Sequence, residues 1–263
     1  MQLGTCPWIS VATYNERENI AALLQEIHNR APQCRVVVTD DNSPDGTGDL
    51  LDEIAANDPR VHVIHRPGKL GFASAHRGGM AYALEQGAEV VLTMDADFSH
   101  DPVCIPALLE CLERGADVAI GSRYVRGGGT RNWPWHRRVL SRGSSLLTRL
   151  GLGVPVRDCT GGFRAYRMSL LKRLRLDKCQ SAGYSFQEEA LLLCRLAGAT
   201  FAETPIIFED RRAGLSKISR QVVLEAIALL FKLSWRRVFD RRRLAEEFLV
   251  EGELPTKNEL SAE

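Results

Sequence analysis

The chain has 263 residues, with 34 Lys+Arg against 33 Asp+Glu and a formal net charge of +1. A composition of 44% hydrophobic and 25% charged residues supports a sizeable core and excludes a disordered, fibrous or disulfide-scaffold chain. The charges are segregated: residues 118–157 contain eight arginines and no Asp, Glu or Lys, whereas residues 36–59 contain seven acids and no Lys or Arg. Because the two blocks cancel, the near-neutral total does not exclude a polyanionic partner.

The seven cysteines are an odd number and include no C-x-x-C pair, which is typical of reduced thiols in a cytosolic protein. The first residues show no basic segment followed by an apolar one, so we expect no signal peptide. No run approaches the roughly 18 apolar residues that a spanning helix needs. These features together predict a cytoplasmic chain.

Apolar strands alternate with amphipathic helices through the first half of the chain. In chain order, strands are expected at residues 8–12, 36–39, 61–64 and 90–94, and helices through residues 20–27, 50–54 and 75–84. This alternation is typical of an α/β fold with a mostly parallel central sheet flanked by helices. In such folds, ligands bind beyond the carboxyl ends of the strands.

The second half is less regular. We expect a strand at 118–121, a helix near 139–150, a late strand within 199–208 and an apolar helix within 222–233. A single domain would then cover residues 1–240. Residues 241–263 are charged and poor in apolar side chains towards their end, so we expect a disordered tail there.

Acidic residues directly follow two of the predicted strands. Asp95 and Asp97 come after the strand at 90–94, and Asp40-Asp41 follows the strand at 36–39. Side chains at i and i+2 of an extended segment point the same way, so Asp95 and Asp97 can converge. Hard carboxylate oxygens suit Mg²⁺ or Mn²⁺ together with substrate phosphates, although a solvated acidic turn would have the same pattern.

Five segments in a fixed order resemble those of dolichol-phosphate (polyprenol-phosphate) mannose synthases of glycosyltransferase family 2. The segments are Ala12 to Asn19, Asp40 to Thr47, Asp95 to His100, Gly121 to Tyr124 and Arg211 to Lys217. The resemblance covers roughly residues 8 to 237. It implies a GT-A fold and inverting transfer of mannose from GDP-mannose to a dolichyl or polyprenyl monophosphate, with Mg²⁺ or Mn²⁺ as cofactor.

The resemblance also implies roles for individual residues. Tyr14, Glu16 and Asp41 would hold the nucleoside, beside the backbone of Ala12 and Thr39. Asp95, Ala96 and Asp97 would hold the sugar nucleotide and the metal, with Ser99 near the metal; Arg123, Arg211 and Lys217 would engage phosphates; and Arg137 and Ser141 would receive the lipid phosphate. Asp97, Arg123 and Arg137 are the implied catalytic residues.

Three positions depart from the family pattern. Ala12 stands where the family usually has Pro, and Asn42 where Gly is common; Asn is the next most tolerant residue for a positive φ. Ser99 stands where some members have Gln, so water is expected to replace a side-chain ligand there.

The transfer to a lipid phosphate would explain why residues 118–157 contain arginine and no lysine. A phosphate monoester is largely a dianion at pH 7, so no general base is needed to create the nucleophile. The enzyme must instead bring two anions together, for which the permanent charge and bidentate fork of arginine are suited.

Two other functions are compatible with parts of the sequence. A related transferase could take glucose or N-acetylglucosamine from a UDP donor, with nearly the same catalytic residues. A nucleic-acid-binding module could use the arginine block and the basic segment 235–243. The acidic clusters would repel a polyanion, so we expect no nucleic-acid partner.

An enzyme whose acceptor is a lipid must act at a membrane surface. We expect the helix at 219–239, with Leu229, Phe231 and Trp235 beside Lys232 and Arg236, to rest against the cytoplasmic face as a peripheral attachment. An ordinary core helix with a basic end is the alternative. Without such attachment, a membrane subunit would be needed as a partner.

Overall fold

The computed structural model describes residues 7–179, 181, 183, 185–209 and 220–250, with the side chains of the last segment described from residue 226. The strands are β1 (Trp8–Thr13), β2 (Arg35–Asp40), β3 (Val61–His65), β4 (Val90–Asp95), β5 (Val118–Ser122), β6 (Gly129–Arg131), β7 (Arg164–Arg167), β8 (Phe201–Pro205) and β9 (Ile207–Glu209). The α-helices are α1 (Arg17–Arg30), α2 (Thr47–Asn57), α3 (Phe72–Glu85), α4 (Ile105–Glu113), α5 (Trp135–Leu152), α6 (Met168–Leu171), α7 (Phe186–Leu196), α8 (Arg220–Phe239) and α9 (Arg241–Phe248). Short 3-10 helices span Pro102–Cys104 and Leu176–Lys178.

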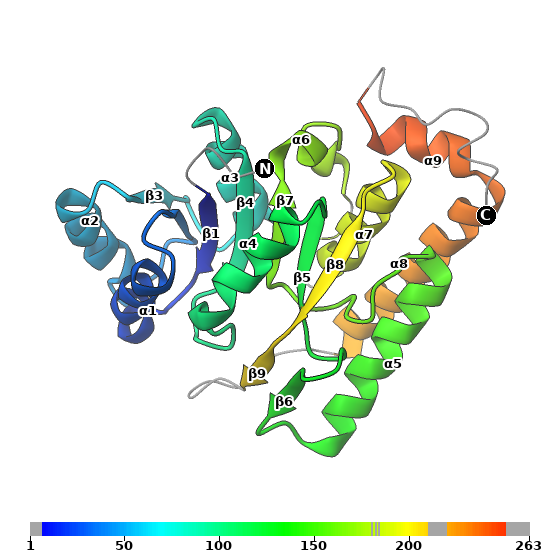
Figure 1. Ribbon diagram of the computed structural model, residues 1–263, viewed down its shortest axis with the longest axis horizontal. Helices are drawn as coiled ribbons and strands as arrows, with labels where there is room; N and C mark the ends of the chain where they lie inside the picture. The colour runs from blue at the N-terminus through cyan, green and yellow to red at the C-terminus, as the bar shows by residue number, and fades with distance from the viewer. Residues whose placement is uncertain (1–6, 180, 182, 184, 210–219, 251–263) are drawn as a thin grey trace.

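In the described part of the chain, seven strands form one sheet in the order β3-β2-β1-β4-β7-β5-β8 (Figure 1). Adjacent strands are parallel except for β7, which is antiparallel to both β4 and β5. The short strands β6 and β9 pair separately. The predicted α/β fold with a mostly parallel sheet flanked by helices is confirmed.

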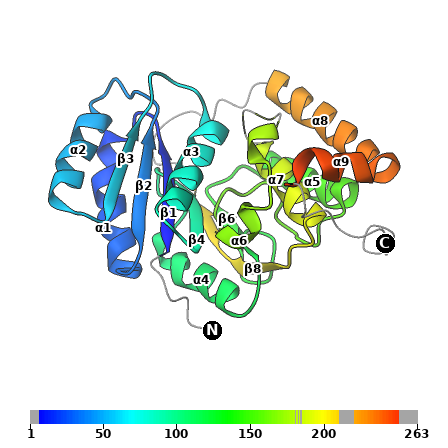
Figure 2. The same cartoon turned by 90° about the horizontal axis from the view of Figure 1, so that it is seen from above.

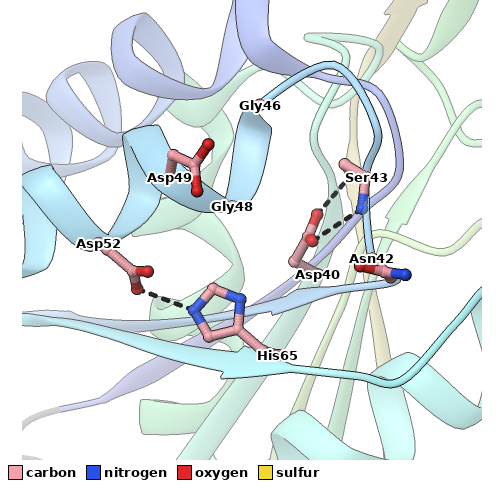
Figure 3. Close-up of a pocket in the computed structure, with 8 residues that line it drawn as sticks. All are labelled: Asp40, Asn42, Ser43, Gly46, Gly48, Asp49, Asp52 and His65. Carbon is pink, nitrogen blue, oxygen red and sulfur yellow. Dashed lines mark hydrogen bonds and ion pairs between the residues drawn. The ribbon is translucent and has the colours of Figure 1, made fainter.

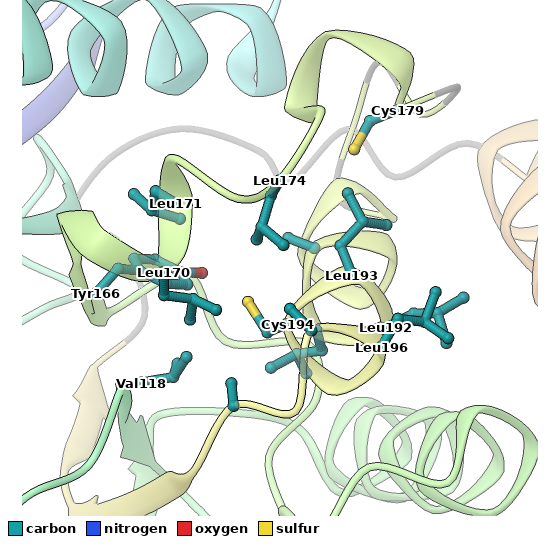
Figure 4. Close-up of a cluster of buried hydrophobic side chains, with 14 of the residues drawn as sticks. Val118, Tyr166, Leu170, Leu171, Leu174, Cys179, Leu192, Leu193, Cys194 and Leu196 are labelled. Carbon is teal, nitrogen blue, oxygen red and sulfur yellow. The ribbon is translucent and has the colours of Figure 1, made fainter. Parts of the chain in front are cut away.

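Helices cover both faces of the sheet, and each face has its own apolar cluster (Figure 2). One cluster joins the sheet to α1, α2 and α4, through residues such as Leu23, Leu51 and Leu108. The other joins it to α3, α7 and α9, where Tyr166 and Leu193 are buried (Figure 4). Strands buried on both faces explain the uniformly apolar runs in the sequence.

The second half of the chain contains elements that the sequence pattern did not indicate. Strand β7 begins with the fully buried Arg164, whose guanidinium donates to the carbonyls of Gln187 and Cys159. An arginine at the centre of a sheet does not have a strand-like hydropathy pattern, so β7 was not expected. The late strand predicted within 199–208 is divided into β8 and β9.

The prediction of a disordered tail from residue 241 is wrong for its first ten residues. Residues 241–248 form α9, which buries Leu244, Ala245 and Phe248 against α7. Three apolar residues at helical spacing are enough to anchor this charged helix. The ordered domain therefore extends to Val250, and residues 251–263 lie outside the described part.

None of the helices in the described residues is long and apolar enough to cross a bilayer.

Candidate active site

The candidate site lies at the carboxyl ends of β2, β1 and β4. Ala12 in β1 is level with Thr39 in β2 on one side and with Asp95 in β4 on the other. From β1, the chain adds β2 and β3 on one side, whereas β4 lies on the opposite side, so the strand order reverses here. Open α/β sheets bind ligands at this switch point.

The turn after β4 fixes the two carboxylates. Asp97 is 8% exposed, and its Oδ1 accepts a hydrogen bond of 3.0 Å from the Ser99 amide. The amide of Asp95 donates to Nδ1 of His100 at 3.0 Å. The His100 ring stacks on Phe163 with centroids 4.9 Å apart. His100 therefore holds the turn in place and acts as a structural residue beside the carboxylates.

Asp40 and Asp41 do not form one acidic cluster, because adjacent side chains point to opposite sides of the chain. The Asp40 carboxylate accepts from the amide and hydroxyl of Ser43 and from Thr13. It lines a hollow of about 240 Å³ next to α2, together with Asp49, Asp52 and His65 (Figure 3). Asp41 instead faces the loop before α3.

Two of the predicted nucleoside residues, Asp41 and Tyr14, already have protein contacts. Asp41 Oδ1 lies 2.7 Å from Arg66 Nη1, and its Oδ2 accepts from the Gly71 amide at 2.9 Å. The ring of Tyr14 has the Lys69 ammonium 3.8 Å from its centroid. These contacts show that Asp41 and Tyr14 also organise the loop at 66–71, which no sequence motif had indicated as part of the site.

The other two nucleoside residues and Ala96 are placed by the strand ends. Glu16 accepts from the Asn19 side chain at 2.8 Å. Thr39 is fully buried, and Ala96 is 3% exposed between the two carboxylates of its turn. The whole of Thr39, backbone included, is thus covered by protein in this structure, and the backbone contact with the nucleoside stays a prediction.

Arg123 follows β5 and is 5% exposed. Its Nε and Nη2 donate to the two carboxylate oxygens of Asp158 at 2.7 and 2.6 Å, and Nη2 also donates to Thr160. Burial by itself would lower the pKa of Arg123, but Asp158, with smaller contributions from Tyr124 and Asp95, raises it above its usual value. The guanidinium is thus permanently charged, and two of its nitrogens are engaged by the protein.

The two predicted acceptor residues lie together on α5. The Arg137 guanidinium stacks over Trp133, with its Cζ atom 4.1 Å from the ring centroid, and Arg123 lies 5.4 Å from the same ring. Ser141 Oγ accepts a 2.6 Å hydrogen bond from the Tyr124 hydroxyl. This bond leaves the Ser141 hydroxyl able to donate outward. Arg123, Arg137 and Ser141 therefore form one cluster around Trp133 and Tyr124.

Arg211 and Lys217, predicted to engage phosphates, lie outside the described residues.

The donor set at the strand end fits a divalent cation that also binds phosphate. Asp95 and Asp97 supply hard oxygen ligands. Among the described residues, no group of three or more His, Cys, Asp or Glu side chains could hold an ion. Mg²⁺ and similar ions commonly take one or two carboxylates and complete their coordination with substrate phosphates and water, which is the arrangement that fits here.

A switch point in the strand order, a D-x-D turn after β4, and an arginine cluster formed by the segment after β5 and helix α5 define a GT-A glycosyltransferase. The chain belongs to glycosyl transferase family 2, whose model matches residues 8–175. It is 43% identical over 236 residues to a polyprenol monophosphomannose synthase of Mycolicibacterium smegmatis, covering 89% of each chain. It is 44% identical over 217 residues to an undecaprenyl-phosphate mannosyltransferase of Micrococcus luteus, covering 82% of this chain and 89% of that protein.

A solved structure with the same fold is glucosyl-3-phosphoglycerate synthase from Mycobacterium tuberculosis in complex with Mn²⁺, uridine-diphosphate-glucose and phosphoglyceric acid. The TM-score is 0.65 at 19% identity, covering 88% of this chain and 80% of that one. This likeness supports the GT-A fold.

The sequence indicated the charged residues of the site but not the side chains that orient them. Asp158, Trp133 and Tyr124 orient the arginine cluster, and Arg66 and Lys69 complete the nucleoside side. Of the first three, only Tyr124 lies inside one of the five segments that resemble the family, Gly121 to Tyr124. Arg66 and Lys69 have no such signal because their contacts depend on how the loop folds back.

Proposed function

We propose that the protein transfers mannose from GDP-mannose to a dolichyl or polyprenyl monophosphate with inversion, giving polyprenyl phosphate β-mannose and GDP. The observation that carries the proposal is the pairing of two sites: a carboxylate turn at the end of β4, and Arg137 with Ser141 on α5. The names of the relatives from Mycolicibacterium and Micrococcus support mannose and a polyprenyl phosphate.

The acceptor phosphate is largely a dianion at neutral pH and attacks without a general base. One of its oxygens forms a bond to the anomeric carbon of mannose while the bond from that carbon to the GDP oxygen breaks. The electron pair of the broken bond leaves with GDP. A single displacement inverts the sugar, so an α-linked donor gives a β-linked product.

We assign Arg137 and Ser141 to the acceptor phosphate. Arg137 offers a guanidinium fork oriented by Trp133, and Ser141 offers a hydroxyl whose oxygen is already fixed by Tyr124. Arg123 adds a fixed positive charge and supports the same aromatic rings. Holding these groups in place before binding reduces the reorganisation needed in the reaction.

We assign Asp95 and Asp97 to Mg²⁺ or Mn²⁺, with Ser99 reaching the ion through water. When bound, the ion supplies Lewis-acid stabilisation of the charge that develops on the departing diphosphate. Tyr14, Glu16 and Asp41, with the backbone of Ala12 and Thr39, would hold the nucleoside. Arg211 and Lys217 would reach the diphosphate, with Ala96 beside the sugar nucleotide.

The test is a matrix of donors and acceptors. GDP-mannose, UDP-glucose and UDP-N-acetylglucosamine are each incubated with a water-soluble short-chain polyprenyl phosphate. GDP-mannose with metal is expected to give the fastest transfer. Faster transfer from either UDP sugar would refute the donor assignment and favour the related polyprenyl-phosphate transferase.

Two variants with matched controls test the residue assignments. Asp97→Asn is expected to abolish metal-dependent binding of GDP, whereas Asp101→Asn, an exposed carboxylate in the same turn region, keeps it. Arg137→Ala is expected to raise the KM for the acceptor phosphate at least about tenfold, whereas Arg114→Ala, which removes an exposed guanidinium just after the end of α4, does not. Wild-type behaviour of Asp97→Asn or Arg137→Ala would remove that residue from the mechanism.

For its place in the cell, we propose peripheral attachment at the cytoplasmic face of a membrane, since the acceptor is a lipid. A membrane subunit is the alternative means of attachment.

A further inference from the structure

The loop between β3 and α3, residues 66–71, lies against one side of the candidate nucleoside site. Its first residue is held by its backbone, because the Arg66 amide donates to the carbonyl of Asp40 at 2.9 Å. The Arg66 guanidinium then binds the far end of the loop. Its Nη2 donates to Ser74 Oγ at 2.6 Å, and its Nη1 donates to the Gly71 carbonyl at 3.3 Å. The loop is therefore tied down at both ends.

Gly71 allows the loop to turn back towards the strand ends. Its φ of 96° lies in the region that favours glycine, and it is the residue directly before helix α3. In this conformation its amide donates to Asp41 Oδ2 at 2.9 Å. The loop is thus bound to the carboxylate that follows β2.

The carboxylate of Asp41 is engaged on both oxygens by this loop. The residue is 4% exposed, and its Oδ1 lies 2.7 Å from Arg66 Nη1, while its Oδ2 accepts from the Gly71 amide. Asp41 therefore fixes where the loop lies. Discrimination between one nucleobase and another then depends on the side chain that the loop presents to the site.

Lys69 is that side chain. Its ammonium lies over the ring of Tyr14, 3.8 Å from the centroid, and among the described residues it makes no hydrogen bond or ion pair. Lys69 is exposed, and a cation over an aromatic ring at an exposed position is held only weakly. The two ends of the loop hold the backbone of Lys69 in place, whereas its charged end is easily released.

The ring of Tyr14 lies at the switch point of the sheet. Tyr14 directly follows β1, and the carbonyl of the preceding residue, Thr13, accepts from the Asp41 amide at 3.1 Å. An aromatic ring in this place offers a surface on which a base can stack, and such stacking does not distinguish one base from another. A base that stacks on the face covered by Lys69 moves the ammonium from the ring to the edge of the base.

The hydrogen-bonding groups on that edge decide what the ammonium gains. An ammonium can only donate hydrogen bonds. Guanine presents two neighbouring acceptors, O6 and N7, whereas adenine has the N6 donor beside N7 and uracil has a single acceptor, O4, on the corresponding side. Lysine binds O6 and N7 of guanine in many specific protein–DNA contacts. The Lys69 ammonium therefore gains more from guanine than from adenine or uracil.

We propose that Lys69 is a specificity-determining residue that selects guanine as the base of the sugar donor, by moving from the Tyr14 ring to O6 and N7 of the base. The inference rests on the proposed function in one respect, that the donor is a guanosine diphosphate sugar. It goes further by assigning base selection to the loop at 66–71. Arg66 and Gly71 hold this loop on Asp41, and Lys69 reaches the ring from there.

The test is calorimetric titration of the full chain with GDP, IDP, ADP and UDP, each with Mn²⁺ and without acceptor. The wild-type protein should bind GDP at least about tenfold more tightly than ADP or UDP. Lys69→Met removes the charge and keeps most of the length of the side chain. It should weaken GDP binding about tenfold and change ADP and UDP binding less than about threefold. IDP lacks the 2-amino group but keeps O6 and N7, so its binding should weaken as much as that of GDP.

Two further variants are the controls. Lys69→Arg keeps a cationic donor and should retain the preference for GDP. Lys172→Met removes an exposed lysine just after α6 and should bind all four nucleotides as wild type does. Equal losses for all four nucleotides in Lys69→Met would place the ammonium on the diphosphate and overturn the inference.

The same titrations separate this inference from the proposed function. A preference for GDP that survives in Lys69→Met would overturn the role of Lys69 and leave the proposed donor standing. A wild-type preference for UDP or ADP would refute the donor itself, and the selection of guanine with it.

Discussion

The buried pair of Arg123 and Asp158 offers the sharpest test of how the acceptor site is built. Asp158 is fully buried and accepts four hydrogen bonds: from the amide, Nε and Nη2 of Arg123 at 2.9, 2.7 and 2.6 Å, and from the Gly161 amide at 3.1 Å. Burial by itself would raise the pKa of Asp158, but Arg123 lowers it below its usual value. Asp158→Asn removes the charge with little change in volume, and its amide group would face donors.

The variant leaves the Arg123 guanidinium buried without its counter-ion. Removing one member of a buried pair costs about 3–5 kcal/mol, because the remaining charge is no longer compensated. At about 2–4 °C per kcal/mol for a chain of this size, the melting temperature should fall by about 6–20 °C. Replacing both partners, as in Arg123→Met/Asp158→Leu, removes the uncompensated charge and should recover much of the lost stability.

The assay combines thermal unfolding with transfer to the short-chain acceptor at a temperature where all variants are folded. The double variant should be more stable than Asp158→Asn but should transfer mannose poorly, because the fixed charge beside Trp133 and Tyr124 is gone. If the double variant is as active as wild type, Arg123 has no part in catalysis. If Asp158→Asn loses less than about 1 kcal/mol, the account of the buried pair is wrong.

Three further predictions concern packing and pH. Burial, with a smaller effect of His100, lowers the pKa of His76 from 6.5 to about 3, so only the unfolded chain takes up this proton as the pH falls below 6.5. Urea titrations should therefore show that the wild-type protein loses about 2 kcal/mol of stability between pH 7 and pH 5 relative to His76→Leu. Equal pH dependence of stability in the two proteins would contradict this. Phe248→Ala should cost about 3–5 kcal/mol in the same titrations, because the side chain is fully buried in α9; a loss below about 1 kcal/mol would mean that α9 does not pack as described. Gly79→Ala should cost about 1–3 kcal/mol, since its Cβ would lie 2.2 Å from Ser10 Oγ, and Gly79→Ala/Ser10→Gly should recover most of that.

Much of the fold could be predicted because its signals are local. The strands β1 to β5 were indicated by apolar runs, and helices α1 to α3 by their apolar spacing. Strand β7 and helix α9 could not be found in this way. The first begins with a buried arginine whose guanidinium donates to the carbonyls of Gln187 and Cys159, and the second has only a few apolar residues within a charged stretch.

In the candidate site, too, some features could be predicted from the sequence and others could not. The sequence places Asp95 and Asp97 together at the end of one strand, but the turn that orients them is held by the Ser99 amide and by His100. The sequence does not reveal that Asp40 and Asp41 separate, or that Arg123 is held by an aspartate 35 residues away. Those outcomes depend on which loops fold back over the strand ends.

The sequence by itself determined the types of charge and their order along the chain: an acidic block, a carboxylate turn, and an acid-free arginine block. Composition and periodicity depend only on the order of residues along the chain, so they can be recognised without knowledge of the fold. The tertiary structure decided what each charge does. Several members of the acidic block are used locally, as when Asp45 accepts hydrogen bonds from Thr47 and Asp58 pairs with Arg60, so these carboxylates already have partners within the protein. Packing also turned helix α5 so that its polar side faces the protein and its large apolar side chains face outward, because the hydroxyls of Ser144 and Ser145 must keep their hydrogen-bond partners.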